Sequence, residues 1–318
     1  MMKRASEREE PVVSIGMPIY NAGKFLRLAV CSILNQTFED WELIIIDDAS
    51  TDGAIAGISD IVDSRIRIID GRHNLGLATR LNEAVSLARG TYFARMDQDD
   101  VSHPERLAKQ LAFLESDPAI DLLATQCVVI NEKNEVTGVL PFRVSHEEIC
   151  AAPWLGLHMP HPTWMGRTAW FRGNAYLSPG PYCCEDQELL LRTFKTSRFQ
   201  VLAEPLLAYR VRNGISLRKL WRTRTTLLRL QRKYFSEYGR PDQSMSAGAA
   251  FLAKFGRDVL RKMNIGGSQV AGIRVHTGEI NDQVVTFWTA LIARLEHRNA
   301  GTLFGDSNSI LAESVNNS

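Results

Sequence analysis

The first third of the chain alternates short apolar segments with amphipathic ones. Strands are predicted at 12–19, 41–46, 65–69 and 91–96, and helices at 24–35, 78–88 and 104–115. A further helix is expected after Ser50-Thr51-Asp52-Gly53, because these residues supply turn and capping side chains. Strands that alternate with helices of this length form βαβ units and a mainly parallel sheet. The sequence therefore predicts an α/β fold with a Rossmann-like sheet flanked by helices.

Two of these strands end in acidic clusters. Asp47-Asp48 follows the strand at 41–46, and Met96-Asp97-Gln98-Asp99-Asp100 follows the strand at 91–96. Ligands of open α/β sheets bind beyond the carboxyl ends of the strands, so both clusters are expected at one site. Neighbouring carboxylates repel one another unless a cation joins them. Mg²⁺ and Mn²⁺ prefer oxygen ligands and leave positions open for phosphates. The pattern predicts a site for a divalent metal and a phosphorylated ligand.

The absence of glycine-rich phosphate-binding loops argues against two classes of protein, those that bind dinucleotides and those with a Walker loop. The loop after the first strand, Tyr20-Asn21-Ala22-Gly23-Lys24, contains one glycine, whereas a dinucleotide-binding protein has a glycine-rich fingerprint there. The chain also lacks a Walker loop. We expect phosphates to be neutralised by a metal and not by a cradle of backbone N–H groups.

Composition and charge limit the possible partners and the cellular location of the protein. A net charge of +1 argues against a nucleic-acid-binding protein, and no window approaches the roughly 20 apolar residues of a membrane span. The first ten residues lack the apolar region of a secretory signal. The five cysteines, an odd number without Cys-x-x-Cys spacing, suit reduced thiols better than zinc or disulfides. A cytoplasmic protein is expected.

Beyond residue 121 the pattern changes. A strand is predicted at 122–130 with a hairpin turn at 131–135, and a helix is predicted from Cys184 to Phe194. The segment 158–182 is rich in Pro, Gly, Trp and His, which is typical of a binding surface. A basic helix at 217–235, a break at Ile265-Gly266-Gly267-Ser268 and an amphipathic helix at 283–298 follow. We expect a catalytic domain at 12–216, a helical extension at 217–298 and a loosely ordered tail at 299–318.

Five motifs occur in an order that resembles a known family. They are Val13-Ser14-Ile15-Gly16-Met17-Pro18-Ile19-Tyr20-Asn21, Ile46-Asp47-Asp48-Ala49-Ser50-Thr51-Asp52-Gly53, Asn74-Leu75-Gly76, Met96-Asp97-Gln98-Asp99-Asp100 and Cys184-Glu185-Asp186. Over residues 12–216 the chain resembles the GT-A inverting glycosyltransferases of family 2, of the polysaccharide-building type. The resemblance implies a GT-A fold and metal-dependent transfer of a sugar from a nucleotide diphosphate, most simply UDP, to a hydroxyl of a glycan or lipid-linked glycan.

On the donor side, the resemblance implies that Asp99 is the main ligand of Mn²⁺ or Mg²⁺ and that Asp97 contacts the ribose or the metal. The alternative is a solvated acidic turn. Asp48 would accept from the imide N–H of a base such as uracil, beside Pro18 and with Tyr20 as a stacking platform. The alternatives are helix capping by the Asp47-Asp48 pair and a core position for Tyr20. Arg80 stands one residue away from the family's arginine, about 100° around a helix, so we expect no phosphate contact from it.

On the acceptor side, the resemblance assigns Asp186 as the general base with Glu185 in support. The alternative is an acidic first helical turn that the macrodipole favours. His158 and His161 are interpreted as surface residues of the acceptor side. Arg212 stands where related proteins have the histidine of a Tyr-Arg-x-His motif, and is expected to bind the diphosphate or simply to be exposed.

Two further interpretations remain open. The rival functions are a non-catalytic nucleotide-sugar-binding protein and a nucleotidyltransferase, but the second would need a glycine-rich loop, and the intact Asp99 and Asp186 argue against the first. The segment 217–236 carries seven basic residues and no acidic one beside an apolar stripe. It would either contact an anionic membrane surface at the cytoplasmic face or pack on the catalytic domain, which we favour.

Overall fold

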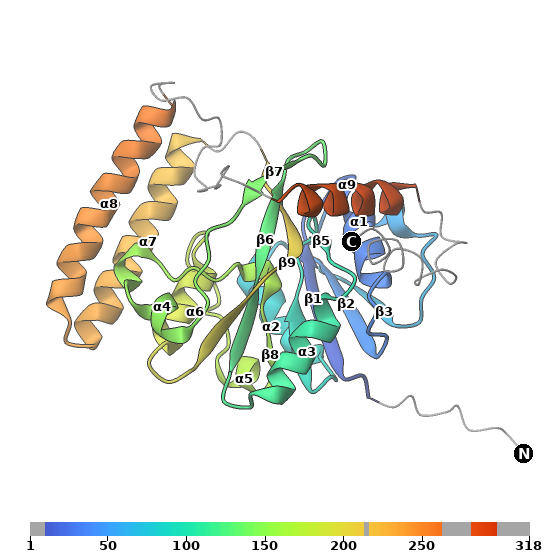
Figure 1. The fold of residues 1–318 in the computed structure, drawn as a ribbon, viewed down its shortest axis with the longest axis horizontal. Helices are drawn as coiled ribbons and strands as arrows, with labels where there is room; N and C mark the ends of the chain where they lie inside the picture. The colour runs from blue at the N-terminus through green and yellow to red at the C-terminus, as the bar shows by residue number, and fades with distance from the viewer. Residues whose placement is uncertain (1–9, 213–215, 263–280, 298–318) are drawn as a thin grey trace, which may run out of the picture.

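The computed structural model describes residues 10–212, 216–262 and 281–297. A nine-stranded mixed sheet lies at the centre of this part of the chain, in the order β3-β2-β1-β4-β8-β6-β9-β5 with β7 paired to β6 (Figure 1). The strands are β1 (Val13–Ile19), β2 (Trp41–Asp47), β3 (Ile66–Asp70), β4 (Tyr92–Arg95), β5 (Val101–Ser102), β6 (Leu122–Ile130), β7 (Val136–Val139), β8 (Met165–Arg167) and β9 (Phe199–Arg210). The first four are parallel, as predicted, and β8 joins them antiparallel to β4.

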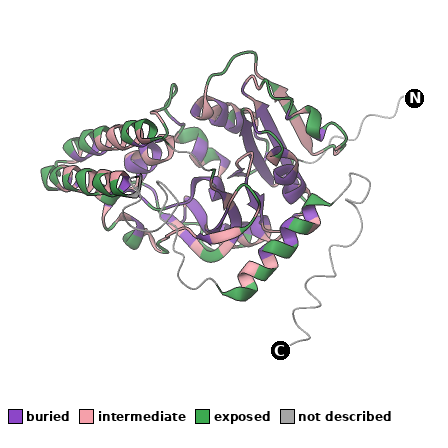
Figure 2. Cartoon of the chain, turned by 90° about the horizontal axis from the view of Figure 1, so that it is seen from above, coloured by how far each residue is buried: buried purple, intermediate pink, exposed green. Residues whose placement is uncertain are grey.

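Helices cover both faces of the sheet because neighbouring side chains of a strand point to opposite sides. In β2, Leu43 and Ile45 belong to one core, whereas Ile44 and Ile46 belong to the other. Helices α1 (Phe25–Leu34) and α3 (Arg106–Ser116) contribute to the first core. Helices α2 (Leu77–Leu87), α5 (Thr168–Gly173) and α6 (Glu185–Thr193) contribute to the second. Figure 2 shows the buried strands at the centre of the molecule.

The C-terminal helices attach at two separate places. Helices α7 (Leu217–Glu237) and α8 (Pro241–Lys262) form a hairpin on the flank of the molecule, where α7 packs on α6 (Figure 1). Helix α9 (Asp282–Glu296) instead packs across α1, and Trp288, Leu291 and Leu295 are buried there, as their spacing predicted. The domain boundaries remain predictions, and the predicted break at 265–268 and the tail at 299–318 lie outside the described residues.

The helix predicted after Ser50-Thr51-Asp52-Gly53 is wrong. Only the single 3₁₀ turn η1 (Ala56–Ile58) forms. The Asp52 carboxylate accepts from Ala54 N at 3.1 Å and from Gly23 N at 2.7 Å, so this side chain closes a turn onto the loop after β1. The remaining short elements are α4 (His146–Cys150), η2 (Pro153–Leu155) and η3 (His161–Thr163). In the described part of the chain, no helix is both long and apolar enough to cross a bilayer.

Strand pairing brings the acidic segments to one edge of the sheet. Ile19 at the end of β1 pairs with Asp47, and Gly16 pairs with Arg95. Gly16 is required at this position because a Cβ there would lie 2.4 Å from Cζ of Phe93. The chain segments that follow β1, β2 and β4 therefore leave the sheet side by side.

Candidate active site

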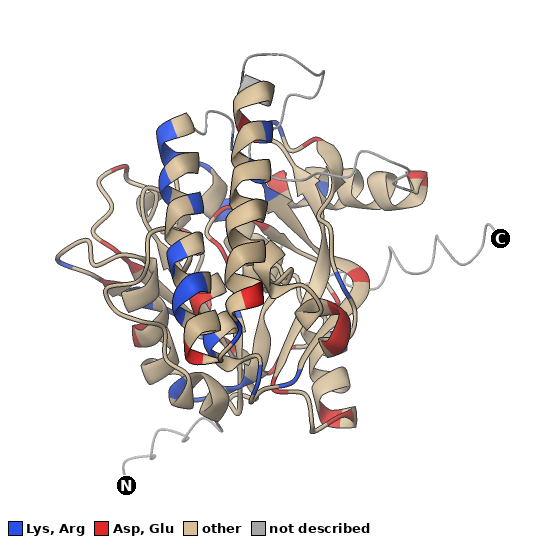
Figure 3. Ribbon diagram, turned by 90° about the vertical axis from the view of Figure 1, so that its left-hand side faces the viewer, with Lys and Arg blue, Asp and Glu red and all other residues tan. Residues whose placement is uncertain are grey.

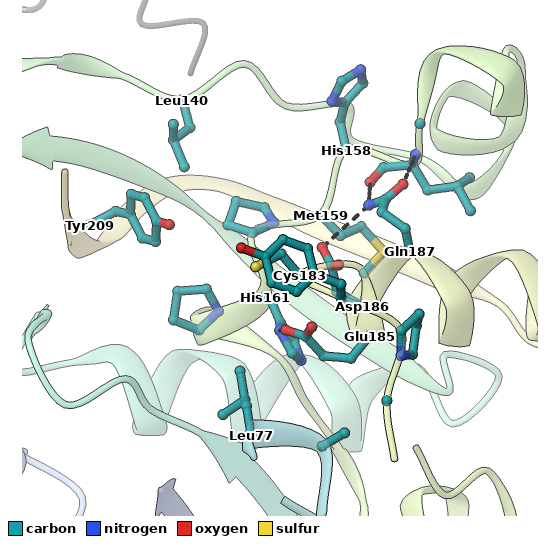
Figure 4. A pocket seen from close by; sticks show the side chains of 18 of the residues that line it. Leu77, Leu140, His158, Met159, His161, Cys183, Glu185, Asp186, Gln187 and Tyr209 are labelled. Atoms are coloured by element: carbon teal, nitrogen blue, oxygen red, sulfur yellow. Dashed lines mark hydrogen bonds and ion pairs between the residues drawn. The ribbon is translucent and has the colours of Figure 1, made fainter. Parts of the chain in front are cut away.

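A cavity of about 1090 Å³ opens between this edge of the sheet and the helices of the second core. Its walls come from the loop at 74–78, from Arg95 and Asp97 after β4, and from the segments 155–162 and 179–187. The inner sides of α7 and α8 close its far end. Figure 4 shows Glu185 and Asp186 in this cavity with His161 and Gln187 beside them and Tyr209 across from them. Tyr20, Asp48 and Asp99 lie outside its lining.

The acidic loop after β4 is held by arginines. Asp97 Oδ1 accepts from Arg95 Nη2 at 2.6 Å, and Asp99 Oδ2 accepts from Arg212 Nε at 2.9 Å. Asp100 is buried, and its Oδ1 accepts from the backbone N–H of Arg210 at 2.8 Å. Asp100 therefore fixes the loop to β9, whereas Asp97 and Asp99 remain partly exposed.

Asp97 and Asp99 suit a hard divalent cation. Burial, together with the charge of Asp97, raises the pKa of Asp99 in spite of its ion pair with Arg212, so a further cation would favour the ionised form of Asp99. Each of the two carboxylates uses one oxygen for its arginine. Among the described residues, no three His, Cys, Asp or Glu side chains gather as a metal site. Two carboxylates fit Mg²⁺ or Mn²⁺, because these ions take one or two carboxylates and complete their shell with water and substrate phosphates.

Asp48 anchors the loop that follows β3. Its Oδ1 accepts from Leu75 N and from Arg80 Nε, both at 2.7 Å, and its Oδ2 accepts from Gly76 N at 2.8 Å. Asp48 is buried, and these three hydrogen bonds use three of the roughly four acceptor positions of its carboxylate. The role of Asp48 toward a base remains a prediction. Arg80 is buried and pairs with Asp48 and Glu83, and its lack of a phosphate contact stays a prediction.

Tyr20 is not a core residue, because 48% of it is exposed. The side chain of Gln98 accepts from Tyr20 N at 2.6 Å and donates to Tyr20 O at 3.1 Å. Gln98 thus ties the loop after β1 to the acidic loop after β4, a role that the sequence analysis missed. Pro18 is buried in β1 opposite Ile46. The surface of Tyr20 is available to a ligand, and its stacking role stays a prediction.

Glu185 and Asp186 form the first turn of α6 and line the cavity. Burial, with a further contribution from the charge of Asp186, raises the pKa of Glu185 to about 7. Burial also raises the pKa of Asp186. Gln187 Nε2 donates to Asp186 Oδ2 at 3.4 Å and to Leu157 O at 3.0 Å, which joins α6 to the segment at 155–159 (Figure 4). Carboxylates with raised pKa values suit proton transfer near neutral pH.

His161 is not a surface residue, contrary to the sequence interpretation. Its Nε2 lies 2.8 Å from the hydroxyl of Tyr176, and its Nδ1 lies 3.7 Å from Oε1 of Glu185. Its ring packs edge-on against Trp164, with centroids 4.4 Å apart. Burial, with the nearby charge of Arg95, holds the pKa of His161 well below its usual range, so the ring stays neutral. His158, in contrast, is exposed at the cavity wall, as expected.

Arg95 is a central cation that the sequence analysis did not single out. It is buried, and its charge acts on Asp97, Tyr176 and Glu185, so it lies between the two acidic groups. Its Nε and Nη1 have no hydrogen-bond partner among the described residues. The sequence signal that could have identified Arg95 is its position in an apolar strand, directly before the acidic motif.

Arg212 lies beside the candidate metal ligands. Besides its ion pair with Asp99, its guanidinium carbon lies 5.2 Å from the centre of the Phe25 ring. The side chain is 40% exposed but held by this ion pair, so it is more than a free surface residue. Contact with a diphosphate remains a prediction.

Comparison with known proteins agrees with this geometry. Residues 14–173 match the family model described as glycosyl transferase family 2. The O-antigen biosynthesis glycosyltransferase WbnJ of Escherichia coli is 33% identical over 64% of this chain and 80% of its own length. The E. coli enzyme WfgD, named as a UDP-Glc:alpha-D-GlcNAc-diphosphoundecaprenol beta-1,3-glucosyltransferase, is 29% identical over 44% of this chain and 56% of its own. The chain spans about half the length of other curated relatives that it matches.

Among solved structures, S. aureus TarS 1-349 in complex with UDP-GlcNAc superimposes with a TM-score of 0.55 at 17% identity, over 89% of this chain and 88% of that one. This likeness confirms the predicted GT-A fold, with its mostly parallel sheet and helical C-terminal region. The family model matches half of the chain, and WbnJ is related over most of its length. The chain therefore belongs to glycosyltransferase family 2.

Proposed function

We propose that the protein is a metal-dependent inverting glycosyltransferase that moves a sugar from a UDP-sugar to a hydroxyl of a glycan or lipid-linked glycan. The observation that carries this proposal is that one cavity has Asp97 on one wall and the Glu185-Asp186 pair on another. A displacement reaction needs these two functions: stabilisation of a leaving phosphate and a base for the attacking hydroxyl.

On the donor side, Asp97 and Asp99 would hold Mn²⁺ or Mg²⁺, and the bound ion would supply positive charge for the leaving diphosphate. Arg212, already paired with Asp99, can turn one N–H toward a phosphate oxygen while it remains in place. Asp48, Pro18 and Tyr20 would hold the nucleoside. The preference for UDP draws on the UDP-GlcNAc complex of TarS and on the UDP-Glc in the name of WfgD.

On the acceptor side, Asp186 would take the proton of the acceptor hydroxyl. The hydroxyl oxygen forms a bond to the anomeric carbon while the bond from that carbon to the diphosphate oxygen breaks. The electron pair of the broken bond remains on the nucleoside diphosphate. Because attack and departure occur on opposite sides of the carbon, the configuration inverts. Glu185 stands beside Asp186 in the first turn of α6 and would support the base, because a neighbouring negative charge makes Asp186 a stronger proton acceptor. A lipid-linked acceptor draws on the name of WfgD.

The test is turnover of a panel of nucleotide sugars with Mn²⁺, with free nucleoside diphosphate as the readout and NMR for the anomeric configuration of the product. A β-linked product from an α-linked donor supports the proposal. Retention of configuration rules out the direct displacement. Binding of nucleotide sugars without release of diphosphate, with every acceptor tried, supports the alternative of a non-catalytic nucleotide-sugar-binding protein. A cytoplasmic location stays a prediction.

A further inference from the structure

The apolar stripe of segment 217–236, for which a membrane contact was one of two interpretations, packs inside the protein. Leu220, Tyr234 and Phe235 of α7 are buried, and Tyr234 and Phe235 belong to the core that α6 helps to build. The hydroxyl of Tyr234 donates to Glu188 in α6. The packing interpretation of α7 is thus confirmed for these residues. The exposed outer face of the α7–α8 hairpin is a different surface.

The outer side of α7 is a row of cations. Arg218, Arg229 and Arg232 are exposed and recur at intervals that keep them on one side of a helix. Arg222 lies at the edge of this row, where its guanidinium stacks on the ring of Tyr182, 3.9 Å from the ring centre. Lys219 and Lys233 are exposed beside the row, and the first acidic residue of the helix is Glu237 in its last turn. Figure 3 shows these basic residues as a blue row along α7. Arg224 is excluded from this row, because it turns toward α8 and pairs with Asp258 at 2.8 Å.

The outer side of α8 is apolar. Met245 is 78% exposed and Leu252 is 70% exposed, and Leu260 continues the same face one repeat later. Between Gln243 and Gly256 the only charged residue is Lys254, whose ammonium turns inward and donates to the carbonyl of Leu155. The sequence analysis assigned no role to α8. Met245, Leu252 and Leu260 thus form an apolar stripe on a helix face without exposed charge from Gln243 to Gly256.

The two rows lie on the same side of the hairpin. The α7–α8 seam is marked by the Arg224–Asp258 pair and by Trp221, which packs on Phe251 and Phe255. The inward sides are marked by Gln231, which donates to Pro153 O, and by Lys254. A turn of about 100° per residue then places Arg218 and Arg229 on the outside of α7 and Leu252 on the outside of α8. Trp221, 47% exposed, lies between the rows.

We propose that this outer face, defined by Arg218, Arg229 and Arg232 of α7 and Met245 and Leu252 of α8, docks on the surface of an anionic lipid bilayer. Cations beside large apolar groups match the two layers that such a surface presents, anionic headgroups and the acyl boundary beneath them. A nucleic acid would match the cations but would leave Met245 and Leu252 unused. A twofold dimer through this face would bury the basic row against a second basic row or against Met245 and Leu252, and neither row offers an acidic partner.

Co-sedimentation with vesicles tests this inference without any readout of activity. The probes are vesicles of phosphatidylcholine with and without phosphatidylglycerol, at low and high salt. We expect binding to the anionic vesicles only, with salt weakening it. Replacing Arg218, Arg229 and Arg232 together by Gln should weaken binding about a hundredfold, since each cation near the headgroups contributes about fivefold. Met245→Ser with Leu252→Ser should leave a weaker binding that salt abolishes.

The control removes three exposed cations elsewhere, by Arg72→Gln, Lys133→Gln and Arg198→Gln, and should bind as the unchanged protein does. Circular dichroism confirms that each variant is folded. Three outcomes overturn the proposal: equal binding to neutral and anionic vesicles, no binding to either, or an equal loss in the control. Self-association in sedimentation velocity that Leu252→Ser abolishes, without vesicle binding, would assign the face to a second copy.

Discussion

Single side chains connect the two acidic groups of the site. Arg95 pairs with Asp97 on the donor side and acts through its charge on Glu185, and His161 lies between Glu185 and Tyr176. A cation between separated carboxylates stabilises both in their ionised forms and fixes their spacing. The motifs identified the carboxylates from the sequence, because acidic residues after strands have a recognisable pattern. They did not reveal Arg95 or His161, whose roles depend on which strands and loops become neighbours.

The proposed metal site predicts the effect of Asp99→Asn. This change keeps the size of the side chain and removes the charge that would hold the cation, so turnover should fall at least a hundredfold. A chelator should reduce the activity of the unchanged protein in the same way. Asp70→Asn is the control, because Asp70 ends the neighbouring strand β3 and is exposed. Initial rates of diphosphate release provide the measurement, and full activity in excess chelator would contradict the metal assignment.

The raised pKa of Glu185 predicts how activity depends on pH. Asp186 acts as a base only when it is ionised, and its pKa is raised by burial, so kcat/KM should rise with pH as the Glu185-Asp186 pair ionises, with Glu185 losing its proton at a pKa of about 7. Asp186→Asn should lower kcat by roughly a hundredfold or more and leave donor affinity nearly unchanged. Glu185→Gln should retain part of the activity and shift the profile to lower pH, because Asp186 loses a like-charged neighbour. A profile unchanged by either substitution would exclude the pair as the base.

The same shift has a consequence for stability. Because the folded pKa of Glu185 lies above the ordinary glutamate value, the folded state binds the proton more tightly than the unfolded state. Ionisation of Glu185 therefore costs stability above the unfolded pKa, and the full cost is present once the pH exceeds about 7. Glu185→Gln should raise the melting temperature at pH 8 and change it little at pH 4. A melting temperature that Glu185→Gln lowers at pH 8 would show that Glu185 is stabilised as a carboxylate in the folded protein.

His161 is a positioning residue in this scheme. His161→Phe keeps a ring against Trp164 but removes the contacts with Tyr176 and Glu185. We expect kcat to fall 10- to 100-fold, in the range that small misplacements of catalytic groups cause. The pH profile should also move, which a merely structural defect would not cause. Tyr176→Phe is the companion variant, and adding it to His161→Phe should cost little more if the two act as a unit.

At the level of elements, the sequence predicted what has a strong local pattern. β1 and β2 are almost entirely apolar because both faces of the sheet are covered there. Such continuous apolar segments are easily recognised as strands in the sequence. Strand β9 was missed, although it is twelve residues long. Glu204 and Pro205 interrupt its apolar pattern, and the pairing of β6 with β9 is irregular beside Pro205. Proline is tolerated in a sheet at such bulges, where no ladder hydrogen bond is lost.

The contact between β1 and β4 predicts the effect of Gly16→Ala. The added methyl would lie 2.4 Å from Phe93 Cζ, and Phe93 is fixed by edge-on packing against Phe171. Overpacking of this kind costs about 1–3 kcal/mol of unfolding free energy. Gly57→Ala is the control, because a Cβ at Gly57 meets nothing within 4 Å. Urea denaturation of both variants is the measurement, and equal midpoints would show that Phe93 can move aside.

At the scale of the whole molecule, the site is assembled from distant parts of the chain. The cavity combines the loop after β3, the end of β4, the start of α6 and the inner sides of α7 and α8. The family motifs end before α7, so no sequence pattern indicated that the C-terminal hairpin closes the cavity or that α9 returns to α1. Such long-range packing depends on complementary surfaces that a one-dimensional pattern does not record.

A donor that bridges these segments should stabilise the fold as a unit. UDP and Mn²⁺ together are expected to raise the melting temperature by about 5 °C at a hundredfold excess over the dissociation constant, because binding to the native state alone shifts the unfolding equilibrium. Either ligand alone should do less, since the carboxylates would repel the diphosphate and the proposed metal site would offer only Asp97 and Asp99 as protein ligands. Asp99→Asn should abolish the joint effect, whereas Asp186→Asn should preserve it because it lies on the acceptor side. Thermal denaturation with each combination separates these cases, and a joint effect that survives in Asp99→Asn would place the metal elsewhere in the molecule.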